Sequence, residues 1–150
     1  MSTASNRSSA GDRPIIFRGV VHPWHHDIFG HMNVRWYGHF FDDAAFFCFH
    51  EFGLDIEEMQ SKHGVHTVTA KSSTSFIREL KAGDLVTIDG GITRMGTKSL
   101  TAELRMLHAD TGVVHATYET VEVFFDPATR QSAAMPDAIR RHLSQFLVEG

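Results

Sequence analysis

Cysteine is nearly absent from this chain of 150 residues, in which Cys48 is the only one. A single cysteine cannot form a disulfide within the chain, so the disulfide-rich secreted class is excluded and a reducing, cytoplasmic location is expected. Cys48 lies within a short run of alanines and phenylalanines. We therefore interpret it as a small buried hydrophobic residue and not as a nucleophile.

Basic residues are also few and scattered. Lys and Arg number 14 against 18 Asp and Glu, which gives a net charge of −4 and a pI near 6.2. Arg140 and Arg141 are the only adjacent basic pair. Proteins that bind nucleic acids usually carry a clustered basic surface, so nucleic acid is not expected as a partner.

Long apolar runs are missing as well. No run approaches the roughly 18 residues that a membrane-spanning helix needs, so no membrane association is expected. The N-terminal residues 1–13 are polar and rich in serine, without the apolar centre of a signal peptide. We expect residues 1–13 to be a disordered tail and residues 14–150 to form one domain.

Aromatic residues, in contrast, are concentrated in one segment. Six of the 12 phenylalanines lie between Phe40 and Phe52, within a stretch whose apolar residues recur at helical spacing. Asn33 is a suitable N-cap and Gly53 a suitable C-terminal stop, which predicts a long, largely buried helix over 34–52. Gly38 is unfavourable inside a helix, so we expect close packing of the backbone against a sheet there.

The rest of the chain favours strands. Apolar and polar residues alternate, with turn residues between the segments. The predicted order is one strand, the long helix, four strands linked by hairpins, and a short C-terminal helix, which is an α+β fold with a five-stranded antiparallel sheet wrapped around the helix. Such a sheet has open edges, and pairing them across a two-fold axis predicts a homodimer or a dimer-of-dimers tetramer. The expected strands cover 14–22, 63–80, 85–94, 99–108 and 113–125, and the last helix 138–148.

A polar loop directly precedes the long helix and carries Asp27, Gly30, His31 and Asn33. The first N–H groups of a helix lack intrahelical acceptors and lie at the positive end of its dipole. They can hold an oxyanion as a carbonyl is attacked, and a nearby carboxylate can act as a base or a nucleophile. The loop is therefore the candidate active site.

This loop and the element order resemble the hot-dog-fold thioesterases, in particular the 4-hydroxybenzoyl-CoA thioesterase-like acyl-CoA hydrolases. The resemblance rests on the motif D-x-x-G-H-x-N over 27–33, the following Tyr37 and acidic Asp42-Asp43, and the segment 76–84 ending in Gly-Asp. It covers residues 15 to 126. Many relatives carry a second acid where this chain has His25, so Asp27 is expected to act alone.

The resemblance implies an acyl-CoA thioesterase that needs no cofactor, since coenzyme A is part of the substrate. We expect Asp27 to be the general base or nucleophile and the Val34 amide to polarise the carbonyl. Asn33 is the helix N-cap and a possible orienting group, and His31 a group that shapes the loop or transfers a proton. The expected substrate-binding residues are Gly30, Tyr37 in the acyl pocket, Ser73 from a second subunit, and Arg78 at the phosphates of coenzyme A.

Three alternatives remain open from the sequence. The density of imidazole around Asp27 suggests a metal enzyme, but the spacing is not that of a helical zinc motif, so no metal is expected. A hot-dog hydratase or dehydratase needs a differently placed histidine. A non-catalytic acyl-CoA-binding protein is the third alternative, because a fold does not determine a function. The imidazole groups concerned are His22, His25, His26 and His31.

Overall fold

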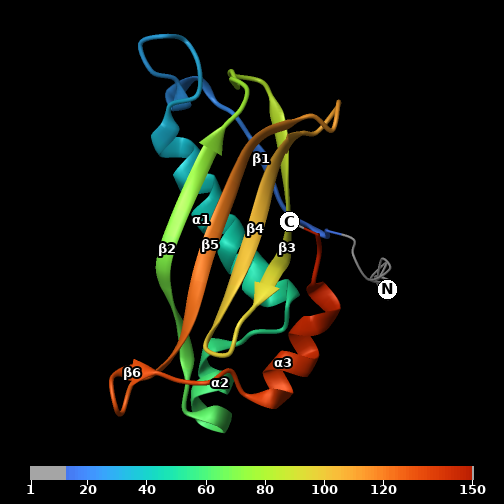
Figure 1. Cartoon of the computed structure of the whole chain (residues 1–150). Coiled ribbons are helices and arrows are strands. Elements are labelled where there is room, and N and C mark those ends of the chain that lie inside the picture. The colour runs from blue at the N-terminus through green and yellow to red at the C-terminus, as the bar shows by residue number, and fades with distance from the viewer. Residues whose placement is uncertain (1–12, 150) are drawn as a thin grey trace.

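The computed structural model describes residues 13–149. A curved sheet packs on one face against a single long helix, and in Figure 1 the strands cross in front of that helix. The strands are β1 (Ile15–Val20), β2 (His66–Phe76), β3 (Leu85–Met95), β4 (Ser99–His108), β5 (Val114–Asp126) and β6 (Gln131–Ser132). The helices are α1 (Val34–Glu51), α2 (Ile56–His63) and α3 (Asp137–Leu143), with short 3-10 turns η1 (Pro23–His25) and η2 (Ser144–Phe146).

The predicted hot-dog fold is confirmed. The strand order is β1-β3-β4-β5-β2 and all pairings are antiparallel, while β6 adds a two-residue pairing to β5 that the sequence did not suggest. β1 and β2 therefore form the two edges of the sheet. The core face of β4 carries the residues whose alternation predicted it, Leu100, Ala102, Leu104 and Met106, all buried.

Helix α1 begins and ends where its sequence signals predict. The Asn33 side chain accepts a hydrogen bond from Arg35 N, and Gly53 follows the C-cap residue with φ +69°. Its buried face consists of Tyr37, Phe40, Phe41, Ala44 and Cys48. Burial of these side chains against the sheet, at about 25 cal/mol per Å² of apolar surface, stabilises the helix far more than its modest intrinsic propensity does.

The space around the glycine within α1 differs from the prediction. Gly38 is exposed, and a Cβ there would meet no atom within 4 Å, so the predicted close packing at this residue is wrong. The close approach occurs instead on β3, where a Cβ on Gly90 would lie 2.6 Å from a Leu104 methyl carbon. On the other face of β3, a Cβ on Gly91 would lie 2.5 Å from a Val148 methyl carbon.

The C-terminal segment differs from the predicted helix over 138–148. Helix α3 ends at Leu143, η2 follows, and Val148 N then donates to Ile92 O at 2.8 Å. Val148 packs over Gly91, which leaves room for it because it has no side chain. The predicted tail 1–13 lies outside the described residues except for Arg13, whose guanidinium pairs with Glu103 at 2.9 Å.

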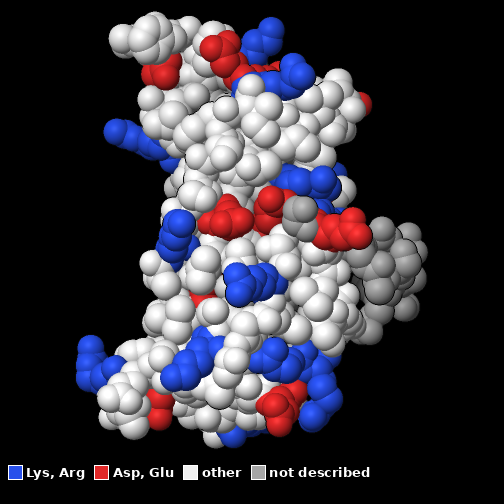
Figure 2. Space-filling view, viewed as in Figure 1, with Lys and Arg blue, Asp and Glu red and all other residues white. Residues whose placement is uncertain are grey.

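The face of the sheet opposite α1 is polar. Arg105 pairs with the buried Asp89, with Nε and Oδ1 2.9 Å apart. Figure 2 shows acidic side chains gathered across the middle of the visible face, with basic side chains above and below them. In the described part of the chain, no helix is both long and apolar enough to span a membrane.

Candidate active site

The loop between η1 and α1 is a tight turn built on Asp27. Its backbone oxygen accepts from Gly30 N at 3.1 Å, and its Oδ1 accepts from Phe29 N at 2.8 Å. Gly30 has φ +78°, a conformation that side-chain-bearing residues rarely adopt. Asp27 N donates to His31 O at 3.0 Å, which closes the loop. The carboxylate is therefore held by one oxygen while the other points to the helix start.

Asn33 connects the Asp27 carboxylate to α1. Its Oδ1 accepts from Arg35 N at 3.1 Å as the helix N-cap, and its Nδ2 donates to Asp27 Oδ2 over a long 3.4 Å. Both roles considered from the sequence, capping and orienting the carboxylate, are thus compatible with one side-chain conformation.

The Val34 amide is the unused donor at the start of α1. Arg35 N donates to the Asn33 side chain, and Trp36 N donates to Asn33 O at 2.9 Å. Among the described residues, the Val34 N–H has no hydrogen-bond acceptor. At the positive end of an 18-residue helix, this N–H is suited to bind a partially negative oxygen.

A second wall faces the loop and comes from the segment after β2. Met32 N donates to Leu80 O at 2.7 Å, and the Tyr37 hydroxyl donates to Arg78 O at 3.4 Å. His31 Nε2 lies 3.1 Å from Glu79 Oε2. The groove between the two walls has a volume of about 270 Å³ and is lined by Asp27, Phe29, His31, Met32, Val34, Tyr37, Phe76, Ile77, Arg78 and Glu79.

The histidines next to Asp27 are held by ring packing and by backbone hydrogen bonds. His25 is buried and packs against Trp36 and Phe40, with ring centroids 4.7 and 5.3 Å away. Its Nδ1 accepts from His22 N at 2.9 Å, and burial lowers its pKa below 6.5, with further lowering by neighbouring histidines. His26 Nε2 accepts from Ala82 N at 2.8 Å, which ties the loop to the β2–β3 connection. His25 is thus a ring packed into the core beside the loop.

Most of the predicted site residues meet at the groove. Asp27, His31, Val34, Tyr37 and Arg78 line it, while Asn33 and Gly30 shape the loop beside it. Tyr37 is buried, and burial raises the pKa of its hydroxyl.

Ser73 lies outside the groove of its own chain. It pairs with Glu119, and the two flanking pairs, Ser72 with Thr120 and Thr74 with Tyr118, point to the core face. Side chains alternate along a strand, so Ser73 lies on the opposite face. Its predicted role in a partner's site remains a prediction.

Sequence reasoning missed Glu79 and the apolar residues Phe29 and Phe76. Glu79 stands in the segment 76–84 that carries the resemblance, but nothing in that segment indicated that it faces the loop. A contact between residues 31 and 79 depends on how the end of β2 turns toward α1.

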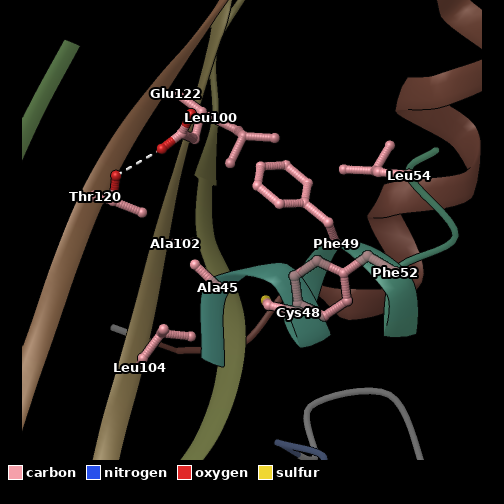
Figure 3. Close-up of a pocket in the computed structure, with 10 residues that line it drawn as sticks. All are labelled: Ala45, Cys48, Phe49, Phe52, Leu54, Leu100, Ala102, Leu104, Thr120 and Glu122. Atoms are coloured by element: carbon pink, nitrogen blue, oxygen red, sulfur yellow. Dashed lines mark hydrogen bonds between the residues drawn. The ribbon is translucent and has the colours of Figure 1, made fainter. Parts of the chain in front are cut away.

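A second cavity lies at the other end of α1, between the helix and the sheet. Its volume is about 40 Å³, and Figure 3 shows apolar side chains around it with Glu122 and Thr120 at one side. It is lined by Ala45, Cys48, Phe49, Phe52, Leu54, Leu100, Ala102, Leu104, Thr120 and Glu122. The Cys48 thiol is buried, and burial raises its pKa to about 12, in keeping with its predicted unreactive role.

No metal-binding arrangement is present over residues 13–149, because no three His, Cys, Asp or Glu side chains come together in a suitable way. The ring nitrogens Nδ1 of His25 and Nε2 of His26 already accept backbone hydrogen bonds.

Solved structures share this fold at low sequence identity. The probable thioesterase YbaW from Escherichia coli has a TM-score of 0.75 and 21% identity, covering 89% of this chain and 99% of its own. The hypothetical protein SAV2348 from Staphylococcus aureus, solved in complex with CoA, has a TM-score of 0.76 and 23% identity, covering 93% and 87%. The 1,4-dihydroxy-2-naphthoyl-CoA thioesterase Slr0204 from Synechocystis has a TM-score of 0.71 and 15% identity, covering 86% and 94%.

No curated protein matches the chain significantly. Residues 21–143, which include the Asp27 loop, α1 and the whole sheet except β1, match the family described as the thioesterase-like superfamily. The resemblance is thus confirmed at the level of the superfamily, while the 4-hydroxybenzoyl-CoA thioesterase-like subgroup remains a prediction. The chain belongs to the thioesterase-like superfamily.

Proposed function

We propose that this protein hydrolyses an acyl-CoA thioester in the groove beside Asp27. The observation that carries the proposal is the Asp27 carboxylate, held through Asn33 next to the unused Val34 amide at the start of α1. A carboxylate and a preorganised N–H donor are the two groups that attack on a thioester carbonyl needs.

In the proposed reaction, the carbonyl oxygen accepts a hydrogen bond from Val34 N–H, which stabilises the negative charge that develops on it. As a general base, Asp27 takes a proton from a water whose oxygen bonds to the carbonyl carbon. The C–S bond then breaks, and the proton returns to the departing sulfur. As a nucleophile, Asp27 bonds to the carbonyl carbon and the C–S bond breaks, which releases the thiolate of coenzyme A. Water then cleaves the resulting anhydride, which regenerates the Asp27 carboxylate and supplies the proton that the thiolate takes up. Both routes give a free acid and coenzyme A.

The groove also offers groups for the rest of the substrate. Tyr37, Phe76 and Ile77 form an apolar wall for the acyl group. Arg78 is an exposed cation at the rim, suited to the phosphates of coenzyme A. The related fold of SAV2348, solved in complex with CoA, supports a coenzyme A ester as the class of substrate.

A homodimer, or a tetramer of two such dimers, completes the proposal. β2 is an edge strand of 11 residues that is exposed over most of its length, and pairing it with its own copy would cover that edge. Ser73 of one subunit would then lie near the two-fold axis. A monomer mass by light scattering at micromolar concentration would contradict this part.

The activity is tested with a panel of acyl-CoA esters, from short to long and from aliphatic to aromatic, scored by release of free thiol. We expect Asp27→Asn to lower kcat by a factor of about 100 or more, the scale of a lost general base, while folding and substrate binding persist. Asp110→Asn, an exposed carboxylate in the turn between β4 and β5, is the matched control and should behave as wild type. Equal hydrolysis by Asp27→Asn would reject the proposal, and binding without hydrolysis by wild type would favour an acyl-CoA-binding protein.

A further inference from the structure

Glu122 on β5 is a buried carboxylate that the proposed reaction does not use. Its side chain lies on the core face, is 7% exposed, and borders the second cavity (Figure 3). Its Oε1 accepts from Thr69 Oγ1 at 2.8 Å and from Thr120 Oγ1 at 2.7 Å. None of the ion pairs among the described residues includes Glu122.

The second oxygen of this carboxylate is available. Oε2 accepts no hydrogen bond within residues 13–149, and no fully enclosed side-chain oxygen or nitrogen there lacks a partner. Oε2 is therefore not fully enclosed and can be reached by a molecule of water size. Burial of a carboxylate is costly unless both its oxygens are satisfied, so an incoming donor would gain a strong, charge-assisted hydrogen bond.

The rest of the cavity is apolar. Helix α1 contributes Ala45, Cys48 and Phe49, and β4 contributes Leu100, Ala102 and Leu104. At about 40 Å³ the cavity holds a few heavy atoms, since one water-sized probe occupies roughly 10–15 Å³. It fits the end of a chain whose last group donates a hydrogen bond, and it does not fit a whole acyl group.

The proposed dimer relates this cavity to the reaction. Thr69 lies near the start of β2 and pairs with Glu122, while Phe76 ends β2, pairs with Ala116 and lines the groove. Both pairs lie on the core face of the sheet. Antiparallel pairing of β2 with its copy would bring the start of one strand beside the end of the other. Glu122 would then lie on the same face, at the same end, as the partner's groove.

We infer that Glu122 selects acyl groups that carry a hydroxyl or an ammonium group at the end distant from the thioester. This inference rests on the proposed function and names its class of substrate. The donor would bind Oε2, and the carbons before it would contact the apolar walls. The two threonine hydroxyls hold the carboxylate in the orientation that this contact requires.

The test uses straight-chain acyl-CoA esters of increasing length, each paired with its ω-hydroxy and ω-amino counterparts. For wild type, we expect kcat/KM to favour a donor-bearing ester by about tenfold or more at one chain length, the scale of a hydrogen bond to a charged group. Glu122→Val, a residue suited to a strand, should reverse that preference. Glu122→Gln should lose the preference for the ammonium and keep part of that for the hydroxyl.

Failure of this inference can be told apart from failure of the proposed function. Equal kcat/KM within each pair at every length, in an enzyme that hydrolyses them all, would overturn the role of Glu122 alone. If wild type hydrolyses none, binding of ω-hydroxy and unsubstituted carboxylates is compared by NMR titration. Tighter binding of the hydroxy acid to wild type, lost in Glu122→Val, would support the cavity; equal binding would reject it. Circular dichroism spectra and unfolding midpoints verify that both variants fold.

Discussion

The His31 imidazole and the Glu79 carboxylate lie 3.1 Å apart, Nε2 to Oε2, and join the loop before α1 to the segment after β2. The pair is exposed, with side-chain exposures of 39% and 74%, so its contribution to global stability is small. Its position is more important, because His31 and Glu79 lie on opposite walls of the groove. We expect the pair to hold the width of the groove.

Replacing Glu79 should therefore affect activity more than stability. For Glu79→Gln we expect kcat/KM of thioester hydrolysis to fall about tenfold, mainly through KM, and the free energy of unfolding to change by less than about 1 kcal/mol. Glu119→Gln, an exposed glutamate on β5, is the matched control. A loss confined to kcat would instead indicate that the pair takes part in proton transfer.

The lowered pKa of His25 predicts that the free energy of unfolding depends on pH. Burial and neighbouring histidines lower this pKa in the folded protein below 6.5. At a pH between the folded pKa and 6.5, the unfolded chain therefore binds more protons than the folded protein does. Stability from His25 is thus fully present above pH 6.5 and is lost as pH falls through the lower folded value. Urea unfolding from neutral to mildly acidic pH should show this fall, and His25→Gln should show a shallower one. Parallel profiles would mean that other groups cause the fall.

Cys48 should be unreactive in the native protein. The thiol is buried and its pKa is raised to about 12, so almost no thiolate is present at neutral pH. A chromogenic disulfide reagent should label it slowly in buffer and rapidly in guanidinium chloride, and activity should survive the native treatment. Rapid native labelling would show that the second cavity opens widely.

Two glycine substitutions should have opposite effects. Gly90→Ala would place a Cβ 2.6 Å from a Leu104 methyl carbon, and we expect overpacking to destabilise the fold by about 1–3 kcal/mol. Gly38→Ala meets nothing within 4 Å in an exposed helical position and should stabilise by about 0.5–1 kcal/mol. Urea denaturation measures both. A destabilised Gly38→Ala would indicate that another subunit covers this face of α1.

Helices and strands were predicted well wherever the residues that determine them lie close together in the sequence. Asn33 and Gly53 mark the ends of α1, and the alternation from Leu100 to Met106 identified β4 and its buried face. The strand predicted over 63–80 is shorter because Gly64, at φ +68°, caps α2, and the chain leaves the sheet after Phe76.

The candidate site was predicted only in part, because only some of its residues are close in sequence. The motif 27–33 identified the loop, because its residues are adjacent. The opposing wall depends on long-range contacts such as Met32 N to Leu80 O, which no local pattern reveals. The buried position of His25 was not predicted either, since the rings that pack on it, Trp36 and Phe40, belong to a different element.

Asn33 has one consequence for how this site can change over time. Its amide oxygen starts the helix that presents Val34 N–H, and its amide nitrogen holds the Asp27 carboxylate. Aspartate at this position would keep the cap but bring a like charge to Asp27, and serine would keep the cap but not reach the carboxylate. Selection therefore cannot adjust the start of α1 and the position of the Asp27 carboxylate separately through this residue. Substitutions in the far wall of the groove, such as at Phe76 or Ile77, would leave both unchanged.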